Sequence, residues 1–265
     1  MLKLRKRIAR LINFPLGKFG FELVRFTPSG EVFTAMEASE EDLKIYQLVS
    51  GYTMADPDAM FSLIQGVRYV IENEIEGDFV ECGTWRGGCA MAIANTLLDL
   101  GITNRIIWVY DTFAGMTEPS AIDVAHDKHR TPAQELLQKY NSRTTQSDWA
   151  KVSLGGVQNS CYSTGYPAEN FRFVEGNVLE TLDLEVTDQI CLLRLDTDWY
   201  DSTWKELETL YPKVAEGGVC IVDDYGAWAG SKLAVDEYFL RHGPRPLFHI
   251  TNWTVRTWIK HFPSR

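Results

Sequence analysis

The sequence predicts an α/β fold in which a mostly parallel sheet carries helices on both faces. Short apolar segments at residues 77–82, 105–111 and 189–195 end in acidic or glycine-rich turns, as strands of doubly wound sheets do. Helical patterns separate these segments, and the regular alternation of strand and helix favours parallel strand pairing. Two further apolar segments, 247–250 and 255–259, are close enough in sequence to form a hairpin, which predicts an antiparallel edge.

Length, composition and charge indicate one globular domain. The chain has 265 residues, of which 45% are hydrophobic and 23% charged. We expect a single domain over residues 31–265, preceded by a basic arm of residues 1–30. The formal net charge of -10 argues against a nucleic-acid partner, because phosphate recognition requires an excess of Lys and Arg.

The arm has the opposite charge from the rest of the chain. Residues 1–25 contain seven Lys and Arg and the single acid Glu22, whereas the remaining 240 residues carry 19 basic and 35 acidic groups. Residues 2–13 have the pattern of a short basic amphipathic helix. Two interpretations remain open for it: a solvated arm or oligomer contact, and a peripheral contact with an anionic membrane or another partner.

Cysteine usage predicts a cytoplasmic protein. The five cysteines are an odd number, have no C-x-x-C spacing, and lie largely in apolar segments, so we expect reduced core thiols. No apolar segment approaches the roughly 20 residues that span a bilayer, and no signal peptide is recognisable.

The first half of the predicted domain contains two helices and two strands. Asp56-Pro57 is a typical helix start, and apolar residues then recur at intervals of three and four up to Ile71, as in a helix that covers a sheet. A strand at 77–82, a helix over 88–100 and a strand at 105–111 follow.

The second half begins with a polar segment of residues 112–168, rich in Gly and Pro, which we interpret as a lid insertion with one or two helices. Regular alternation then resumes. The remaining predicted strands and helices are strands 171–175, 189–195, 218–222, 247–250 and 255–259 and helices 202–211 and 232–241. Asp201 is expected to cap the first of these helices.

The turn after the first strand predicts a ligand site. Gly83, Gly87 and Gly88 permit close approach of backbone to a ligand and leave a helix N-terminus free to donate hydrogen bonds. Dinucleotide sites prefer G-x-G-x-x-G, and Glu81 would repel a pyrophosphate here, so a cationic or zwitterionic ligand fits better. Asp111, at the end of the next strand, is placed to bind the two hydroxyls of a ribose.

A second group of acidic residues predicts a metal site. Asp196, Asp223 and Asp224 follow two other apolar strands, so their side chains are expected at the same carboxyl edge of the sheet. Three carboxylates that converge with no Lys or Arg nearby would repel one another unless a cation neutralised them. Oxygen ligands favour Mg²⁺, with Ca²⁺ and Mn²⁺ as alternatives.

Four sequence blocks, in order, resemble the macrocin O-methyltransferase family of class I S-adenosylmethionine-dependent enzymes. The blocks begin at Val80, Tyr110, Arg194 and Gly218, and the similarity covers roughly residues 50–240. It implies a Rossmann-like fold with seven strands in the order 3-2-1-4-5-7-6, methyl transfer to sugar hydroxyls of antibiotic glycosides, and a requirement for magnesium. The chain departs from the family at Cys89, where Ser is frequent.

The resemblance also implies roles for individual residues in binding S-adenosylmethionine. Glu81, Gly83 and Thr84 would hold its methionine part, and Asp111 and Phe113 its ribose. The remaining contacts would come from Gly176, Asn177 and Val178 at the adenine and from Thr53 and Met54, which would close over the cofactor.

The chemistry of methyl transfer to an alcohol suggests a catalytic base. A sugar hydroxyl is a poor nucleophile near neutral pH, so its proton must be removed and its oxygen aimed at the methyl group. A bound metal ion does both, and a nearby carboxylate then accepts the proton. Asp198 is the candidate base, because it lies two residues beyond Asp196, and the family pattern agrees.

Several alternatives remain open from the sequence. A catechol or another vicinal aromatic diol would suit the same carboxylates, and the acceptor is also compatible with a cell-surface or lipid-linked saccharide. An NAD-dependent oxidoreductase or epimerase is a further class, although no Tyr has Lys four residues later. A non-catalytic nucleotide-binding module would leave the aspartates unexplained. A homo-oligomer is expected from the family tendency and the arm.

Some side chains have both a structural and a functional interpretation. His126 and His129 lie in the expected lid. They are either incidental surface residues or contacts to the substrate. Four aromatic residues beside the acidic blocks either stack on a sugar or pack in the core: Trp199, Tyr200, Tyr225 and Trp228.

Overall fold

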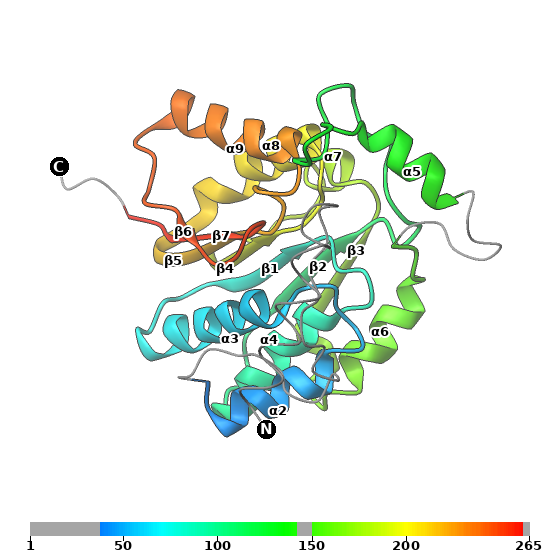
Figure 1. The fold of residues 1–265 in the computed structure, drawn as a ribbon. Coiled ribbons are helices and arrows are strands. Elements are labelled where there is room, and N and C mark those ends of the chain that lie inside the picture. Colours follow the sequence, from blue (N-terminus) through cyan, green and yellow to red (C-terminus); the bar gives the residue numbers. More distant parts are fainter. Residues whose placement is uncertain (1–37, 142–149, 262–265) are drawn as a thin grey trace, which may run out of the picture. The chain divides into compact units, whose positions relative to one another are not determined.

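The structure, a computed structural model, describes residues 38–141 and 150–261, which contain a seven-stranded sheet (Figure 1). The strand order is β3-β2-β1-β4-β5-β7-β6. The strands are β1 Asp78–Cys82, β2 Ile107–Asp111, β3 Phe171–Glu175, β4 Ile190–Leu195, β5 Val214–Val222, β6 His249–Ile250 and β7 Arg256–Ile259. Strands β1 to β5 pair in parallel, whereas β7 is antiparallel to β5 and to β6. This topology confirms the predicted Rossmann-like class I methyltransferase fold and its antiparallel edge.

Helices cover both faces of the sheet. Helices α2, α3, α4 and α6 lie on one side of it and α7, α8 and α9 on the other (Figure 1). The helices are α2 Glu40–Val49, α3 Pro57–Glu72, α4 Gly88–Asp99, α5 Ala133–Asn141, α6 Leu154–Tyr162, α7 Val178–Thr181, α8 Tyr200–Leu210 and α9 Ala229–His242, with short 3₁₀ helices η1 Ala168–Asn170 and η2 Tyr211–Lys213.

Helix α3 forms where the sequence predicts it. The Asp56 side chain accepts a hydrogen bond from the backbone N–H of Ala59 (2.9 Å), and Pro57 occupies the first helical position. The apolar residues of the predicted stripe, including Met60, Leu63 and Val67, are buried. Each such side chain contributes about 1.5–3 kcal/mol when it leaves water, which holds the helix against the sheet.

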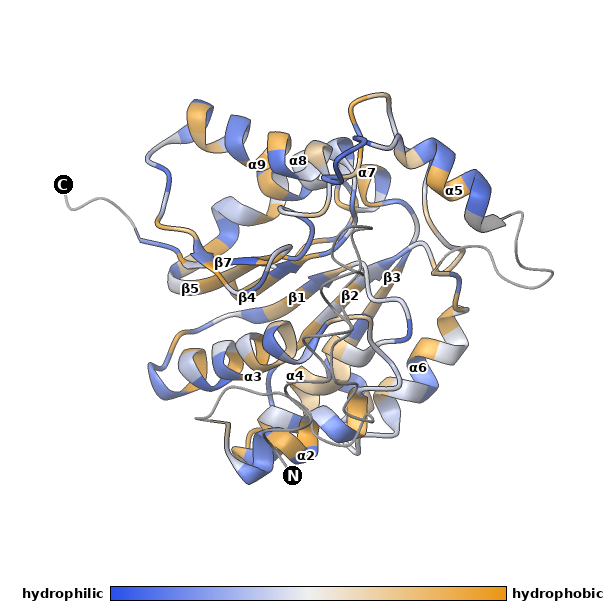
Figure 2. Cartoon of the chain, viewed as in Figure 1, coloured by the Kyte–Doolittle hydropathy of each residue, from blue (hydrophilic) through white to orange (hydrophobic). Residues whose placement is uncertain are grey.

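Alternation along the strands divides the core in two. Phe79 packs in the cluster that includes α2, α3, α4 and α6, whereas its neighbour Val80 packs with α8 and α9. Ile107 and Trp108 of β2 divide in the same way. Successive strand residues point to opposite faces, so a strand covered on both sides is mostly apolar. Figure 2 shows hydrophobic residues along the central strands, interrupted by a few hydrophilic ones.

Several element boundaries differ from the prediction, and two of them lie near the carboxylate cluster or its strands. Strand β5 begins at Val214 rather than 218, with a register irregularity in its pairing with β4. Helix α8 begins at Tyr200, and its N-cap residue is Trp199, so the prediction that Asp201 caps it is wrong. The backbone N–H of Tyr200 instead donates to Oδ1 of Asp123 (2.8 Å), a residue 77 positions away.

The segment 112–168, predicted to be a lid, has distinct parts. Residues 120–132 are anchored to the body: Ala125 forms a β-bridge with Trp228, and Asp123 is buried. Helix α6 packs on α4, with Val157 and Cys161 in the core. These parts belong to the scaffold, and a lid function of the segment stays a prediction. The basic arm, residues 1–30, lies outside the described residues.

The five cysteines are all buried and free, which confirms the prediction of core thiols. Within the two described ranges, no helix combines the length and the apolar character that crossing a bilayer requires.

Candidate active site

A cavity of about 240 Å³ lies at the carboxyl edge of the sheet, where ligands of open α/β folds bind. Its wall includes the turn after β1, the end of β2, the turns after β3, β4 and β5, and part of the insertion. The lining residues are Met54, Ala55, Gly83, Thr84, Trp85, Tyr110, Asp111, Thr112, Gly115, Met116, Thr117, Ala150, Gly176, Asn177, Val178, Asp196, Thr197, Asp198, Ser202, Asp223 and Asp224.

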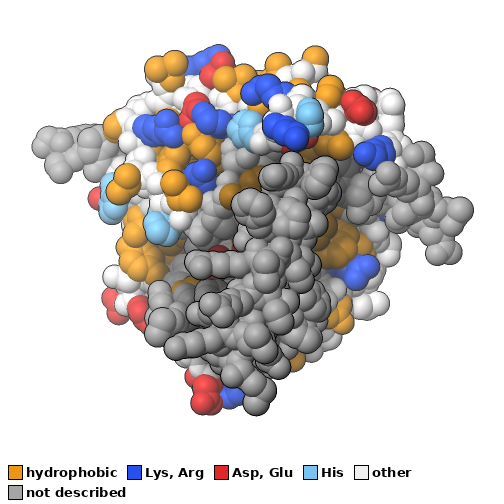
Figure 3. All heavy atoms as spheres, viewed as in Figure 1, with side chains coloured by type: hydrophobic (Ala, Val, Ile, Leu, Met, Phe, Trp, Pro, Cys, Tyr) orange, Lys and Arg blue, Asp and Glu red, His pale blue; other side chains and the backbone are white. Residues whose placement is uncertain are grey.

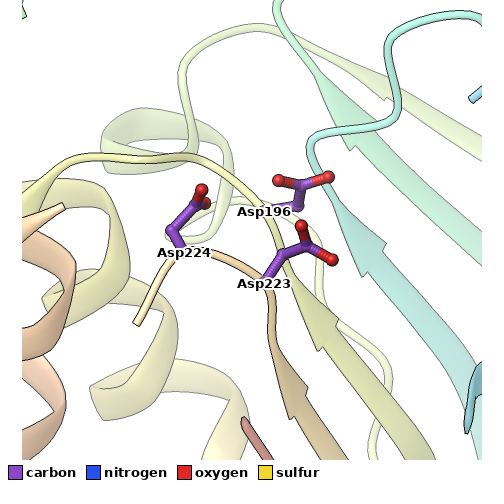
Figure 4. A group of neighbouring side chains, drawn as sticks. All are labelled: Asp196, Asp223 and Asp224. Carbon is purple, nitrogen blue, oxygen red and sulfur yellow. The ribbon is translucent and has the colours of Figure 1, made fainter. Parts of the chain in front are cut away.

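The three aspartates predicted to bind metal converge in this cavity. Asp196 directly follows β4, and Asp223 and Asp224 directly follow β5. One carboxylate oxygen from each lies within 4.8 Å of the others. Figure 4 shows the carboxylate of Asp196 above that of Asp223, with the carboxylate of Asp224 to the left of both in this view. The structure therefore brings together residues that are separated by nearly 30 positions in sequence.

The expectation that no Lys or Arg lies near these carboxylates is wrong. Nη2 of Arg194 is 2.8 Å from Asp196 Oδ2 and 2.7 Å from Asp223 Oδ1. Nη1 of the same side chain donates to Glu81 Oε1 at 2.9 Å. Arg194 was hidden in the sequence because it lies in an apolar strand, at a position where a buried hydrophobic residue is usual. One internal cation thus neutralises part of the acidic charge.

The site nevertheless keeps excess negative charge. Burial raises the pKa of Asp223 to about 6, with a further contribution from the negative charge of Asp196. Burial also raises the pKa of Asp224 well above its ordinary value, and Asp198 is the largest of the neighbouring charges that add to the shift. A hard divalent cation would relieve this repulsion, and an all-oxygen donor set is the kind that Mg²⁺ prefers. The residues present therefore fit such an ion.

Asp198 lies in the same cavity and is held from two sides. Its Oδ1 accepts a hydrogen bond from Nε1 of Trp228 (2.6 Å), and its backbone N–H donates to Asp224 Oδ2 (3.0 Å). Its φ of 67° is in the left-handed region, which is uncommon for a residue with a side chain. Burial raises the pKa of Asp198 to about 8, and the charge of Asp196 adds to the shift. Asp198 thus lies in the cavity wall beside the three aspartates, where a base for a hydroxyl held at this end would have to be.

The glycine turn after β1 is in backbone contact with the end of β4. Gly83 has φ 82°, and a Cβ at this position would lie 1.9 Å from the carbonyl oxygen of Asp196. The turn therefore requires glycine for both its conformation and its packing. Thr84 follows and lines the cavity, and its hydroxyl donates to Oε2 of Glu81 (2.8 Å).

Asp111 links the turns after β1 and β2 through hydrogen bonds. Its Oδ2 accepts from the backbone N–H groups of Thr84 (2.8 Å) and Trp85 (3.2 Å), and its Oδ1 accepts from that of Phe113 (2.8 Å). The hydroxyl of Thr112 also lies 3.4 Å from Oδ1 of Asp111. The predicted contact of Asp111 with the two hydroxyls of a ribose stays a prediction.

The structure divides the other predicted cofactor residues into two groups. Met54, Gly83, Thr84, Gly176, Asn177 and Val178 line the cavity. Thr53, Glu81 and Phe113 do not line it. Glu81 has no exposed surface, Phe113 packs in the core, and the Thr53 hydroxyl accepts a hydrogen bond from the backbone of Ala55. Both oxygens of Glu81 have a partner within the protein, Arg194 and Thr84, and its contact with a cofactor stays a prediction.

The structure places both histidines and the two tryptophans that had two interpretations. His126 and His129 are exposed and do not line the cavity, and Nδ1 of His126 contacts the carbonyl oxygen of Gly226 (2.8 Å). Trp199 and Trp228 are buried and pack edge to face, with ring centroids 5.0 Å apart. Core packing, not sugar stacking, is the role that this geometry supports for the two tryptophans.

Sequence reasoning missed several residues of the wall. Trp85 lines the cavity at a φ of 52°, and Met116, Thr117 and Ala150 line it from the insertion. Trp85 follows the Gly83-Thr84 turn directly, so its position in the motif was an available signal. The insertion residues have no local signal, because their place in the wall depends on contacts with residues that are distant in sequence.

Comparison of the sequence with known proteins gives a consistent result. The profile of a family described as Macrocin-O-methyltransferase (TylF) matches residues 34–260. The chain is 35% identical over 189 residues to a demethyldecarbamoylnovobiocin O-methyltransferase from Streptomyces niveus, covering 71% of this chain and 68% of that protein. It is 29% identical over 208 residues to a mycinamicin III 3''-O-methyltransferase from Micromonospora griseorubida, covering 78% of each chain.

Comparison of the structure agrees with that of the sequence. The O-methyltransferase NovP superposes with a TM-score of 0.72 at 28% sequence identity, over 84% of this chain and 98% of that one. The calicheamicin methyltransferase CalS11 superposes with a TM-score of 0.55 at 16% identity, covering 89% of this chain and 99% of that one, which shows a shared fold.

Proposed function

Since the chain belongs to the macrocin O-methyltransferase family and is an S-adenosylmethionine-dependent O-methyltransferase, we propose that it methylates a hydroxyl of a sugar or glycoside and that it uses Mg²⁺. Family membership excludes the alternative of an NAD-dependent oxidoreductase or epimerase, and that of a non-catalytic nucleotide-binding module.

The observation that carries the proposal is the convergence of carboxylates beside the glycine turn. Oxygens of Asp196, Asp223 and Asp224 lie within 4.8 Å of one another in the same cavity that Gly83 and Thr84 line. The methyl donor of the family is S-adenosylmethionine, so a donor at this turn would present its methyl group toward the aspartates. A hydroxyl held between them would lie where the reaction requires it.

The donor would occupy the side of the cavity formed by β1, β2 and β3. Thr84 and the neighbouring backbone would bind its methionine part, and Asp111 would accept hydrogen bonds from its ribose. Asn177 begins α7, with its side chain accepting from the backbone N–H of Leu179 (3.0 Å). Together with Gly176 and Val178, it forms the part of the wall that we assign to the adenine.

The proposed mechanism is a direct displacement. The acceptor oxygen attacks the methyl carbon, the bond between carbon and sulfur breaks, and S-adenosylhomocysteine leaves with the electron pair on sulfur. Asp198 takes the proton of the hydroxyl. Asp196, Asp223 and Asp224 would hold Mg²⁺, which, when bound, makes a neighbouring hydroxyl more acidic. Trp228 keeps the carboxylate of Asp198 oriented through the hydrogen bond from its indole N–H.

The acceptor class follows from the relatives. One acts, by its name, on demethyldecarbamoylnovobiocin, a second on a rhamnosyl-tetracenomycin at the 4' position, and a third on mycinamicin III at the 3'' position. The second name includes a rhamnosyl group, which supports a sugar hydroxyl as the acceptor here. The cavity wall formed by Met116, Thr117 and Ala150 is where we place the acceptor, because these residues come from the insertion rather than from the donor turns.

A methyl-transfer assay with labelled donor tests the proposal. The purified protein is incubated with panels of glycosides and catechols, with and without EDTA, and with Mg²⁺ restored. We expect incorporation into glycosides that EDTA abolishes and Mg²⁺ restores. Incorporation confined to catechols would contradict the acceptor class, and full activity in EDTA would contradict the metal requirement.

We further propose a homo-oligomer. Large hydrophobic side chains are exposed near the edge of the sheet, among them Leu247 (92%), Trp253 (72%) and Ile250 (65%). Figure 3 shows hydrophobic side chains among Lys, Arg and His on the surface around α9 and β6. Light scattering at several protein concentrations tests the assembly, and replacement of Leu247 and Trp253 by Ser should reduce the measured mass.

The basic arm motivates a proposal about membranes. Its charge would attract it to an anionic surface by about 1 kcal/mol for each basic residue near that surface. The acceptor would then include membrane-presented or lipid-linked saccharides made in the cytoplasm, a location for which the five free thiols also argue. Deletion of residues 1–25 should abolish sedimentation with anionic liposomes, and unchanged sedimentation would contradict the proposal.

A further inference from the structure

The buried side chain of Arg194 connects two parts of the site: Glu81, which precedes the glycine turn, and the aspartates that follow β4 and β5. Arg194 lies on β4 directly opposite Glu81 of β1 in the parallel pairing, so both side chains project to the same face of the sheet. Its side chain is only 4% exposed. Nη1 donates to Glu81 (2.9 Å), whereas Nη2 contacts Asp196 (2.8 Å) and Asp223 (2.7 Å).

The guanidinium group fixes the two aspartates relative to each other. Asp196 and Asp223 follow different strands, and their like charges would drive them apart. A planar group that contacts one oxygen of each carboxylate prevents this and defines the directions in which the remaining lone pairs point. The carboxylates are therefore arranged for a cation by a protein group that does not itself face the cavity.

Glu81 in turn fixes Arg194. A buried guanidinium is costly unless its charge is paired and its donors are bonded. Glu81 supplies that partner from a position with no exposed surface, and its second oxygen accepts from the hydroxyl of Thr84 (2.8 Å). Both oxygens are thus engaged within the protein, which leaves Glu81 behind the cavity wall.

We propose that Glu81 and Arg194 are positioning residues for the divalent-ion site formed by Asp196, Asp223 and Asp224, and that Glu81 acts on ion binding rather than by contact with the methionine part of the donor. This inference rests on the proposed function, because it assumes the ion. Glu81, the acid beside the glycine turn, would thus affect the neighbouring ion site through the buried side chain of Arg194.

The substitution Glu81→Gln tests the inference, because it keeps the shape of the side chain and removes its charge. Affinity for Mn²⁺ as a probe ion is measured by electron paramagnetic resonance, and affinity for S-adenosylhomocysteine by calorimetry. We expect about 10-fold weaker Mn²⁺ binding, the usual effect of losing a group that orients metal ligands. Binding of S-adenosylhomocysteine should stay within twofold of the wild type.

Glu206→Gln is the matched control. Glu206 is also a fully buried carboxyl group near the site, but it accepts from the hydroxyl of Thr197 (2.9 Å) rather than from Arg194. The affinity of the Glu206→Gln variant for Mn²⁺ should be within twofold of that of the wild type. Arg194→Lys provides a second test that is independent of Glu81: it keeps the charge but cannot bridge the carboxylates as a planar fork, and it should also weaken Mn²⁺ binding about 10-fold.

The outcomes are distinct. Weaker binding of S-adenosylhomocysteine with unchanged Mn²⁺ binding in Glu81→Gln would show a donor contact and overturn the inference. Mn²⁺ affinity equal to that of the wild type in both Glu81→Gln and Arg194→Lys would also overturn it. If the wild-type protein takes up no Mn²⁺, the proposed ion site fails as well, and this result is recognisable before any variant is made.

Discussion

The indole Nε1 of Trp228 donates a hydrogen bond of 2.6 Å to Oδ1 of Asp198, the residue to which we assign proton removal. The backbone of the same tryptophan forms a β-bridge with Ala125 of the insertion. One residue therefore orients the candidate base and attaches the insertion to the body of the domain.

Replacement of Trp228 by Phe should lower the turnover number about tenfold while donor affinity is kept. The substitution removes the N–H donor but retains an aromatic ring, and a hydrogen bond to a charged group contributes about 1.5–3 kcal/mol. Steady-state kinetics with labelled donor measures the effect. Trp199→Phe is the control, since the indole of Trp199 donates to the carbonyl oxygen of Thr117 and not to Asp198. Equal losses in the two variants would argue against orientation of the base.

Asp198→Asn should reduce turnover by a factor of about 10²–10⁴, the range that a general base contributes. The amide cannot accept the proton, but it can keep a hydrogen bond from Trp228. Binding of S-adenosylhomocysteine, measured by calorimetry, should be unchanged. Turnover near the wild-type value would mean that another group takes the proton.

Asp123→Ala should destabilise the protein by about 2 kcal/mol, because the backbone N–H groups of Tyr200 and Ser120 lose their acceptor. The insertion should then be cleaved faster between residues 112 and 132 in limited proteolysis. Asp127→Ala is the control: that carboxylate is exposed and bonds only within its own turn, so we expect little change. Denaturant unfolding measures the free energies, and equal stabilities of the two variants would contradict the anchoring role.

Stability should depend on pH through Glu206. Burial raises the pKa of Glu206 well above its ordinary value of 4.5. The unfolded chain therefore releases this proton at a lower pH than the folded protein does. The contribution of Glu206 to stability is complete below pH 4.5 and is lost as the pH rises toward the folded-state pKa.

Glu206→Gln removes this dependence, because the amide does not titrate. The variant should melt at a higher temperature than the wild type at pH 8, and the difference should shrink as the pH falls to 4.5. Differential scanning calorimetry across this range measures it. A difference in melting temperature that does not change with pH would show that Glu206 does not titrate on unfolding.

The elements predicted correctly have local signals. The start of α3 at Asp56-Pro57 and the acid after each strand depend on residues that are adjacent in sequence. Because the carboxyl ends of parallel strands share one edge, the meeting of Asp196 with Asp223 follows from the strand assignments. The family resemblance supplied the strand order, which alternation cannot determine.

The elements predicted wrongly or missed depend on register and on distant contacts. Arg194 reaches Glu81 and Asp223 because β1, β4 and β5 align at particular residues, and no local pattern encodes that alignment. The backbone N–H of Tyr200, at the N-terminus of α8, donates its hydrogen bond to Asp123, which lies 77 residues earlier. Sequence spacing therefore pointed to Asp201, the nearest capping residue, and the fold uses a remote one.

The contact between Gly83 and the carbonyl oxygen of Asp196 has a consequence for altering acceptor preference. The two turns touch through their main chains, with no room for a methyl group between them. Substitutions in either turn would disturb both at once, so libraries aimed at new acceptors should leave them intact. Diversity is better introduced at Met116, Thr117 and Ala150, which border the same chamber without this constraint.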